Sequence, residues 1–144
     1  MQTDTNYEKD FYKWSLDQAK LLRSGKLIDA DIENIAEEIE SMGKSEKREL
    51  ISRLKILLIH LLKWDYQPSR QSKSWKNTIK VQRMEITDHL EDNPSLKYKL
   101  DEILVKAYNR SRIEAATETG LDETTFPVTC PYSFEKIMER EVKF

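Results

Sequence analysis

The chain has few glycines and prolines, which break helices, and few cysteines, which cross-link small folds through disulfides. Its 144 residues include three glycines, four prolines and one cysteine, Cys130. A single cysteine cannot form an intramolecular disulfide, and so few turn-forming residues do not suit a β-rich protein. The sequence therefore excludes an intrachain disulfide scaffold and favours a helical protein of a reducing compartment. No basic or histidine neighbour activates Cys130, so we interpret it as a small apolar residue.

Long apolar runs are also missing. The longest, ILLIHLL at residues 56–62, is much shorter than the roughly 18 residues that a membrane-spanning helix requires. The first ten residues, MQTDTNYEKD, are polar and acidic, unlike the basic and then apolar pattern of a signal peptide. We therefore expect a cytoplasmic protein with no membrane partner.

Neither sign of charge dominates the whole chain, but each dominates one stretch. Charged residues make up 35% of the sequence and the net charge is −2, so overall charge does not point to a nucleic-acid binder. Residues 51–83 nevertheless carry eight Lys or Arg against Asp65 alone, whereas residues 29–42 carry six acids and no base. We therefore expect any charged partner to bind one of these two stretches, because the chain as a whole is nearly neutral.

Apolar residues recur at spacings of three and four along most of the chain, which predicts helices. The predicted helices run from Thr5 or Asn6 to Gly25, from Asp29 to Gly43, from about Ser45 to Trp64, from Ser72 or Ser74 to about Leu90, and from Asn93 to about Thr119. A short helix then begins at Ser133. The fold class is all-α: a compact helical bundle of about five main helices plus this short C-terminal helix, forming a single helical domain over residues 1–144.

The same pattern predicts which residues form the core. From about residue 56 the third predicted helix is apolar nearly all round, which places it at the centre. The second should bury Ile32, Ile35, Ala36 and Ile39. The tail, residues 121–144, is too apolar for solvent, and we expect it to dock on the bundle through Phe126, Tyr132, Phe134, Ile137 and Met138.

The segment LLKWDYQPSRQSKSWKNTIKVQR, residues 61–83, combines basic and aromatic side chains. Lys73, Lys76, Lys80 and Arg83 are three, four and three residues apart, so they form one row on a helix. A basic row beside aromatic rings is suited to phosphate contacts and base stacking. The candidate binding residues are Lys63, Trp64, Tyr66, Arg70, Lys73, Trp75, Lys76, Lys80, Gln82 and Arg83.

A simpler interpretation of the same segment is structural. Glu33, Glu37 and Glu40 repeat at the same interval as part of the basic row, so the two rows can pair within one chain or across a homodimer. Trp64 and Trp75 fall at helical spacing with core residues. Gln82 interrupts an apolar stripe, so its amide either bridges to another group or lines a site. The sequence leaves open whether the basic row is exposed or paired.

The motifs for catalysis and metal binding are sparse. His60 and His89 are the only histidines, and no Glu-x-x-His pair is present, so we predict no metal site and no cofactor. Arg53 and His60 are nearly two helical turns apart on one face. This spacing resembles the Arg-x(4–6)-His motif of HEPN-type ribonucleases, although Leu54 stands where those enzymes commonly have a polar residue. The resemblance implies that Arg53 would stabilise a phosphate and that His60 would act as acid or base. The alternative is an edge arginine and a hydrogen-bonded histidine within an apolar helix.

Four stretches in this order resemble the bacterial DUF29 family, domain of unknown function 29. They are YEKDFYKWSLDQAKLLRSGK, IAEEIESMGKSEKREL, LLIHLLKWDYQPSRQSKSWKNTI and AATETGLDETTFPVTCPYSFEKIM. The resemblance covers residues 7–138 and implies a single all-helical domain. The part of the family pattern that we carry over is His60, Lys63, Trp64, Tyr66, Gln67, Pro68, Arg70, Ser74 and Trp75. It implies no catalytic set.

Together these features favour a non-enzymatic role. No phosphate-binding loop, metal cluster or activated nucleophile is apparent, whereas two complementary charge rows are present. The leading hypothesis is a small cytoplasmic interaction or regulatory module that binds an unidentified protein partner and forms a homodimer. The alternatives are RNA or other nucleic-acid binding through residues 63–83, and a metal-independent ribonuclease that uses Arg53 and His60.

Overall fold

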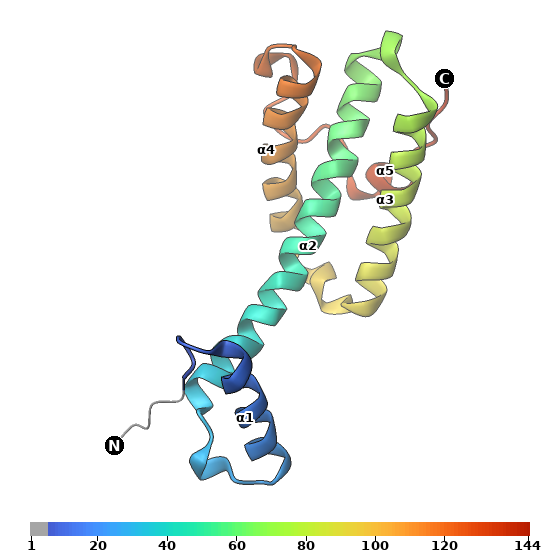
Figure 1. Cartoon of the computed structure of the whole chain (residues 1–144). Coiled ribbons are helices and arrows are strands. Elements are labelled where there is room, and N and C mark those ends of the chain that lie inside the picture. Colours follow the sequence, from blue (N-terminus) through green and yellow to red (C-terminus); the bar gives the residue numbers. More distant parts are fainter. Residues whose placement is uncertain (1–5) are drawn as a thin grey trace. The chain divides into compact units, whose positions relative to one another are not determined.

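The computed structural model describes residues 6–144, which contain helices and loops but no β-strand (Figure 1). The α-helices are α1 (Phe11–Arg23), α2 (Ile32–Tyr66), α3 (Lys73–Asp92), α4 (Leu100–Thr119) and α5 (Phe134–Glu139). Short 3₁₀ helices join them: η1 (Leu27–Asp29), η2 (Pro68–Arg70), η3 (Pro94–Lys99) and η4 (Glu123–Thr125). The predicted all-α fold class is confirmed. No described helix has the length and apolar content needed to cross a membrane.

Several predicted helix ends are confirmed by their capping contacts. The Ser72 and Ser133 side chains accept hydrogen bonds from the backbone N–H groups of Trp75 and Lys136, which fixes the starts of α3 and α5. Gly120 closes α4 with a φ of 75°, a left-handed conformation that glycine adopts without steric cost.

Two other predicted starts differ from the structure. The helix α1 begins after Asp10, which caps Lys13 N, rather than near Asn6, because Asn6 has a φ of 64°. Thr5, the alternative start, lies outside the described residues. The residues after Asn93 form the 3₁₀ helix η3 before α4 begins at Leu100.

The predicted break at Gly43 is wrong. The helix α2 runs without interruption from Ile32 to Tyr66, so the second and third predicted helices are one. Strong helix formers surround Gly43, and one glycine inside a helix costs only about 1 kcal/mol relative to alanine. Glycine ends a helix when the chain turns into the left-handed region, and Gly43 does not adopt a positive φ.

The contacts of the chain divide it into two compact units, residues 1–45 and 46–144. In the described part of the N-terminal unit, α1 packs on the start of α2. Trp14 Nε1 donates to Asp31 Oδ2 at 3.0 Å, and the Asp31 N–H donates to Gln18 Oε1 at 2.7 Å. Tyr7 donates to the Glu38 carboxylate. The predicted burial of Ile32, Ala36 and Ile39 is wrong, since all three are exposed, the two isoleucines by 50% and 58%. Ile35 is half-buried.

The C-terminal unit contains the hydrophobic core. The part of α2 from Leu50 to Trp64 supplies its centre, and α3 and α4 flank this part of the helix (Figure 1). Buried residues of the other elements complete the core: Ile79, Ile86, Leu90, Ile103, Ala107, Tyr108, Ala115, Phe126, Ile137 and Val142. The tail thus docks on the core, as the sequence predicts.

The tail is also held by polar contacts. Arg140 forms a two-pronged ion pair with Asp65 at 2.8 and 3.0 Å, and the Tyr132 hydroxyl donates to the same carboxylate. This arrangement raises the pKa of the Arg140 guanidinium, chiefly through the hydrogen bond to Asp65. Arg112 donates to the Phe126 carbonyl at 3.1 Å. These contacts tie the tail to α2 and α4.

The continuity of α2 predicts that Gly43→Ala stabilises the protein. A Cβ at residue 43 would meet no atom within 4 Å, and alanine lowers the entropy of the unfolded chain. We expect the free energy of unfolding to rise by about 1 kcal/mol in urea denaturation followed by circular dichroism. Gly120→Ala is the control and should destabilise by about 1 kcal/mol because of the left-handed φ. Equal effects of the two substitutions would contradict a helical Gly43.

Candidate functional site: the α3 groove and the His89 cluster

A groove of about 540 Å³ runs along α3 in the C-terminal unit. It is lined by Lys73, Lys76, Asn77, Ile79, Lys80, Arg83 and Met84 of α3 and by Glu141 and Val142 of the tail. We call it the α3 groove. All four members of the predicted basic row line it, and apolar side chains lie between them. The structure therefore brings the row together as one surface.

The lysines of the row are open to solvent. Lys73, Lys76 and Lys80 are exposed, and none of them forms an ion pair with another residue in the range 6–144. The Lys76 ammonium lies 5.3 Å from the centre of the Phe144 ring. The pairing of the row with Glu33, Glu37 and Glu40 stays a prediction, because those acids belong to the N-terminal unit.

The Arg83 side chain is engaged in contacts within the protein. Its Nε donates to the Ile137 carbonyl at 2.8 Å, so it ties α3 to α5. Burial lowers the pKa of Arg83, and the nearby positive charge of Arg140 adds to this effect. The groove thus has three ammonium groups without an ion pair among the described residues and one structural guanidinium.

The aromatic residues of the segment are mostly packed away. Trp64 is buried, and its ring centre lies 5.3 Å from that of Phe144. The Lys63 ammonium lies 4.7 Å from the centre of the Trp75 ring. Tyr66 packs on Phe126 with ring centres 5.1 Å apart. Arg70 is exposed in η2 and does not line the groove.

The amide of Gln82 is less well satisfied than the sequence suggests. Its Oε1 is buried and has no hydrogen-bond partner among the described residues. An unsatisfied buried carbonyl costs about 1–3 kcal/mol. The predicted bridge from this oxygen is absent in the described part of the chain, and Gln82 is not one of the residues lining the α3 groove.

Arg53 and His60 do not meet in one cavity. Arg53 lines a polar pocket of about 370 Å³, where its Nη2 lies 3.1 Å from Glu49 Oε1 and 3.8 Å from Glu85 Oε2. His60 lines another pocket, and its Nδ1 lies 2.8 Å from the Ile56 carbonyl. Burial lowers the pKa of His60. These contacts match the structural alternative for both residues.

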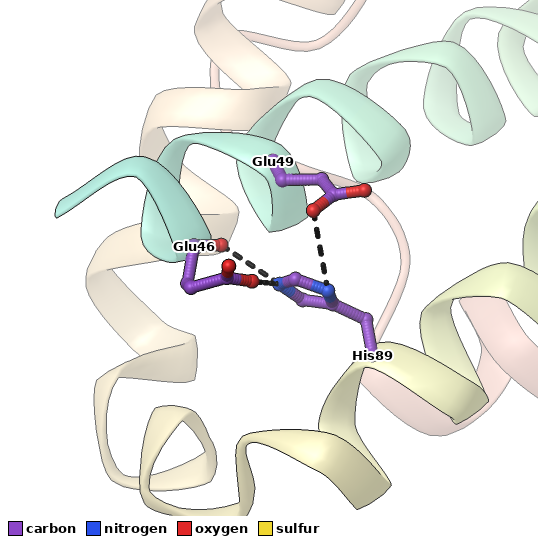
Figure 2. Close-up of side chains that lie close together, drawn as sticks. All are labelled: Glu46, Glu49 and His89. Carbon is purple, nitrogen blue, oxygen red and sulfur yellow. Dashed lines mark hydrogen bonds and ion pairs between the residues drawn. The ribbon is translucent and has the colours of Figure 1, made fainter. Parts of the chain in front are cut away.

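The polar pocket holds a cluster that sequence reasoning missed. His89 of α3 is 8% exposed and lies between Glu46 and Glu49 of α2 (Figure 2). Its Nε2 is 2.8 Å from the Glu46 carbonyl oxygen and 3.6 Å from Glu46 Oε2. Its Nδ1 is 3.5 Å from Glu49 Oε2. Because a carbonyl oxygen only accepts, Nε2 must carry a hydrogen.

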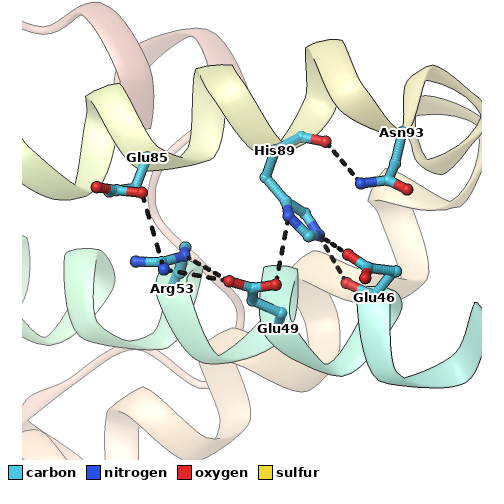
Figure 3. A network of polar contacts seen from close by, with 6 residues as sticks. All are labelled: Glu46, Glu49, Arg53, Glu85, His89 and Asn93. Carbon is cyan, nitrogen blue, oxygen red and sulfur yellow. Dashed lines mark hydrogen bonds and ion pairs between the residues drawn. The ribbon is translucent and has the colours of Figure 1, made fainter. Parts of the chain in front are cut away.

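The cluster extends into a chain of alternating groups across the two helices (Figure 3). Glu85 contacts Arg53, Arg53 contacts Glu49, and Glu49 contacts His89, which reaches Glu46. Glu49, the carboxylate in the middle of this series, therefore lies between the Arg53 guanidinium and the His89 ring. We call this set, Glu46, Glu49, Arg53, Glu85 and His89, the His89 cluster.

The His89 cluster was hidden from sequence reasoning because its members are about 40 residues apart. The available signal was an interval pattern. Glu46, Glu49 and Arg53 are three and four residues apart, and the facing residues Glu85 and His89 are four residues apart. Only the antiparallel packing of α3 on α2 makes that pattern meaningful (Figure 3).

The donor set of Glu46, Glu49 and His89 invites a metal interpretation. One ligand atom from each lies within 4.8 Å of the others. However, the two carboxylates approach opposite nitrogens of the ring (Figure 2). An ion coordinates only one of these nitrogens, and Nε2 already donates to the Glu46 carbonyl. The geometry therefore fits a ring that bridges two helices better than a three-ligand metal centre.

The described residues thus define an all-α protein with a solvent-open basic groove and a separate polar cluster. Its chain belongs to the family described as domain of unknown function DUF29, whose model matches residues 6–142. The predicted resemblance to this family is confirmed. Comparisons with curated proteins and with solved structures found no match.

If the His89 cluster joins α2 to α3, His89→Ala should destabilise the protein. The substitution removes a hydrogen bond and two carboxylate contacts from a buried site, so we expect a loss of about 2 kcal/mol in urea denaturation. Lys106→Ala, an exposed change on α4, should alter stability by less than about 0.5 kcal/mol. Added Zn²⁺ should shift the melting temperatures of wild type and His89→Ala equally. A zinc-dependent rise that requires His89 would contradict the bridging role.

Proposed function

We propose that this protein is an interaction module whose α3 groove binds an acidic segment of a partner protein that also carries apolar side chains. The observation that carries this proposal is the combination of three exposed, unpaired lysines with an apolar floor in the described C-terminal unit. The apolar lining consists of Ile79, Met84 and Val142. Such a surface suits neither a purely polar nor a purely apolar ligand.

Charge complementarity points to an acidic partner. Lys73, Lys76 and Lys80 lie on one side of α3 at intervals of three and four residues. A partner helix with acids at the same intervals would face them, and the apolar residues between those acids would reach the floor of the groove. Charge would speed the encounter and orient the segment, and the buried apolar area would supply much of the affinity.

The packing of the aromatic residues favours a protein over a nucleic acid. Sequence-tolerant binding of single strands uses exposed rings on which bases stack. Trp64, Trp75 and Tyr66 are engaged in packing, which leaves Phe144 as the exposed ring beside the groove. Phosphate contacts alone would not use the apolar floor.

The proposal predicts that a fluorescein-labelled peptide with Glu and Leu at helical spacing binds the protein in fluorescence anisotropy. Lys76→Glu/Lys80→Glu should weaken this binding at least about tenfold, because two attractions become repulsions. Lys97→Glu/Lys99→Glu makes the same change in net charge on η3 and should leave binding nearly unchanged.

Two further probes separate the proposal from its alternatives. A matched peptide with Gln in place of Glu should bind weakly, and labelled single-stranded oligouridine should bind more weakly than the acidic peptide. RNA binding that is tighter than peptide binding and is lost in Lys76→Glu/Lys80→Glu would replace the proposal with the nucleic-acid alternative. Shortening of the RNA that requires His60 would instead indicate a ribonuclease. Peptide binding that is equal in both double variants would exclude the groove.

A further inference from the structure

After α5 the chain continues along the α3 groove without forming a helix. Val142 is buried and lines the groove, and two residues further on the Phe144 ring centre lies 5.3 Å from that of Trp64. Glu141 and Lys143 are exposed and form an ion pair with each other at 3.1 Å. This alternation is typical of an extended segment. The tail thus turns its apolar side chains toward the protein and its charges toward solvent.

The Phe144 side chain is held more weakly than the residues before it. Arg140 is fixed by its two-pronged ion pair with Asp65, and Val142 belongs to the hydrophobic core. Phe144 is 67% exposed, although it packs on Trp64, whose own exposed fraction is 4%. Because most of the Phe144 surface is already in water, moving the ring away gives up little buried apolar area.

The place that Phe144 occupies adjoins the α3 groove beside the first half of α3 (Figure 1). Lys76 belongs to both, since it lines the groove and its ammonium lies 5.3 Å from the centre of the Phe144 ring. We call this place the Trp64 seat, defined by Trp64 and Lys76. An indole ring on which to pack and a cation beside it suit an aromatic or large apolar side chain.

The tail carries the kinds of side chain that the groove is proposed to bind, but it satisfies the groove only in part. Val142 and Phe144 supply apolar contacts, and Glu141 supplies an acid. Within residues 6–144, however, Glu141 pairs with Lys143, and the three lysines of the row form no ion pair. A segment with acids opposite those lysines would make charge contacts that the tail does not make.

We propose that the Trp64 seat is a subsite of the α3 groove for an aromatic or large apolar side chain of the partner, and that Phe144 occupies it until the partner displaces that ring. The inference rests on the proposed function, because it concerns the same groove. The partner's acids bind the lysines of the row, and its apolar side chain replaces Phe144 on Trp64. A purely acidic segment cannot replace that contact, so the seat selects partners that combine both kinds of side chain.

The substitution Phe144→Ala tests this competition in the full chain. In fluorescence anisotropy with the Glu/Leu peptide, we expect the affinity to rise at least about threefold, because the peptide no longer displaces a bound ring. Phe144→Trp should bind no more tightly than wild type, since a larger ring fills the seat. Tyr98→Ala removes a 91% exposed ring from η3 and is the matched control. It should leave the affinity unchanged.

Fluorine NMR detects the displacement directly. The full chain carries 4-fluorophenylalanine at residue 144, and a short peptide of residues 139–144 with the same label gives the signal of a free ring. Saturating Glu/Leu peptide should move the signal of the full chain to that of the free ring. A peptide with Ala in place of Leu should leave the signal where it is, and its weak binding should not improve in Phe144→Ala.

The direction of the Phe144→Ala effect separates the outcomes. Weaker binding would mean that the partner packs on Phe144 itself, and unchanged binding would place the ring outside the binding surface. Either result, or a fluorine signal that the Glu/Leu peptide does not move, would overturn the subsite. The proposed function would still stand if Lys76→Glu/Lys80→Glu weakens binding. Absence of peptide binding to both wild type and Phe144→Ala would overturn the proposed function and the subsite together.

Discussion

Burial of the second half of α2 is the constraint on which the C-terminal unit depends. From Leu50 to Trp64 this helix presents apolar side chains nearly all round, and no single neighbour covers such a surface. The helices α3 and α4 flank it, and the docked tail adds Phe126, Ile137 and Val142. Each fully buried aliphatic or aromatic side chain contributes about 1.5–3 kcal/mol. The placement of every other feature of this unit follows from that burial.

Polar contacts then decide which surfaces stay open. Asp65 of α2 binds Arg140 and Tyr132, and directly after Arg140 the tail residues Glu141 and Val142 line the groove together with α3. Arg83 is held by a carbonyl of α5, whereas Lys73, Lys76 and Lys80 form no ion pair within the described unit. In the His89 cluster, by contrast, three carboxylates flank one arginine and one histidine. The groove therefore has lysines without an ion pair among the described residues, whereas the His89 cluster brings acids and bases into contact.

The sequence predicted the helices well where local physics decides. The caps at Ser72 and Ser133, the left-handed stop at Gly120 and the central position of the most apolar helix were all correct, because each depends on a few neighbouring residues. Gly43 was misread because glycine permits a helix end without requiring one. The candidate site was predicted in part: periodicity placed four basic residues in one row, whereas the packing of Trp64 and the tail contacts of Arg83 involve residues far along the chain.

What the sequence by itself determined was the all-α class, the basic row and the apolar stripes, since these follow from spacing along a helix of known period. What only the tertiary structure decided was which stripes are covered. Ile32 and Ile39 show the same pattern as core residues, yet the N-terminal unit leaves them exposed. His89 meets Glu46 and Glu49 only because α3 packs on α2. Burial is a property of contacts between distant segments, and periodicity along one helix cannot specify them.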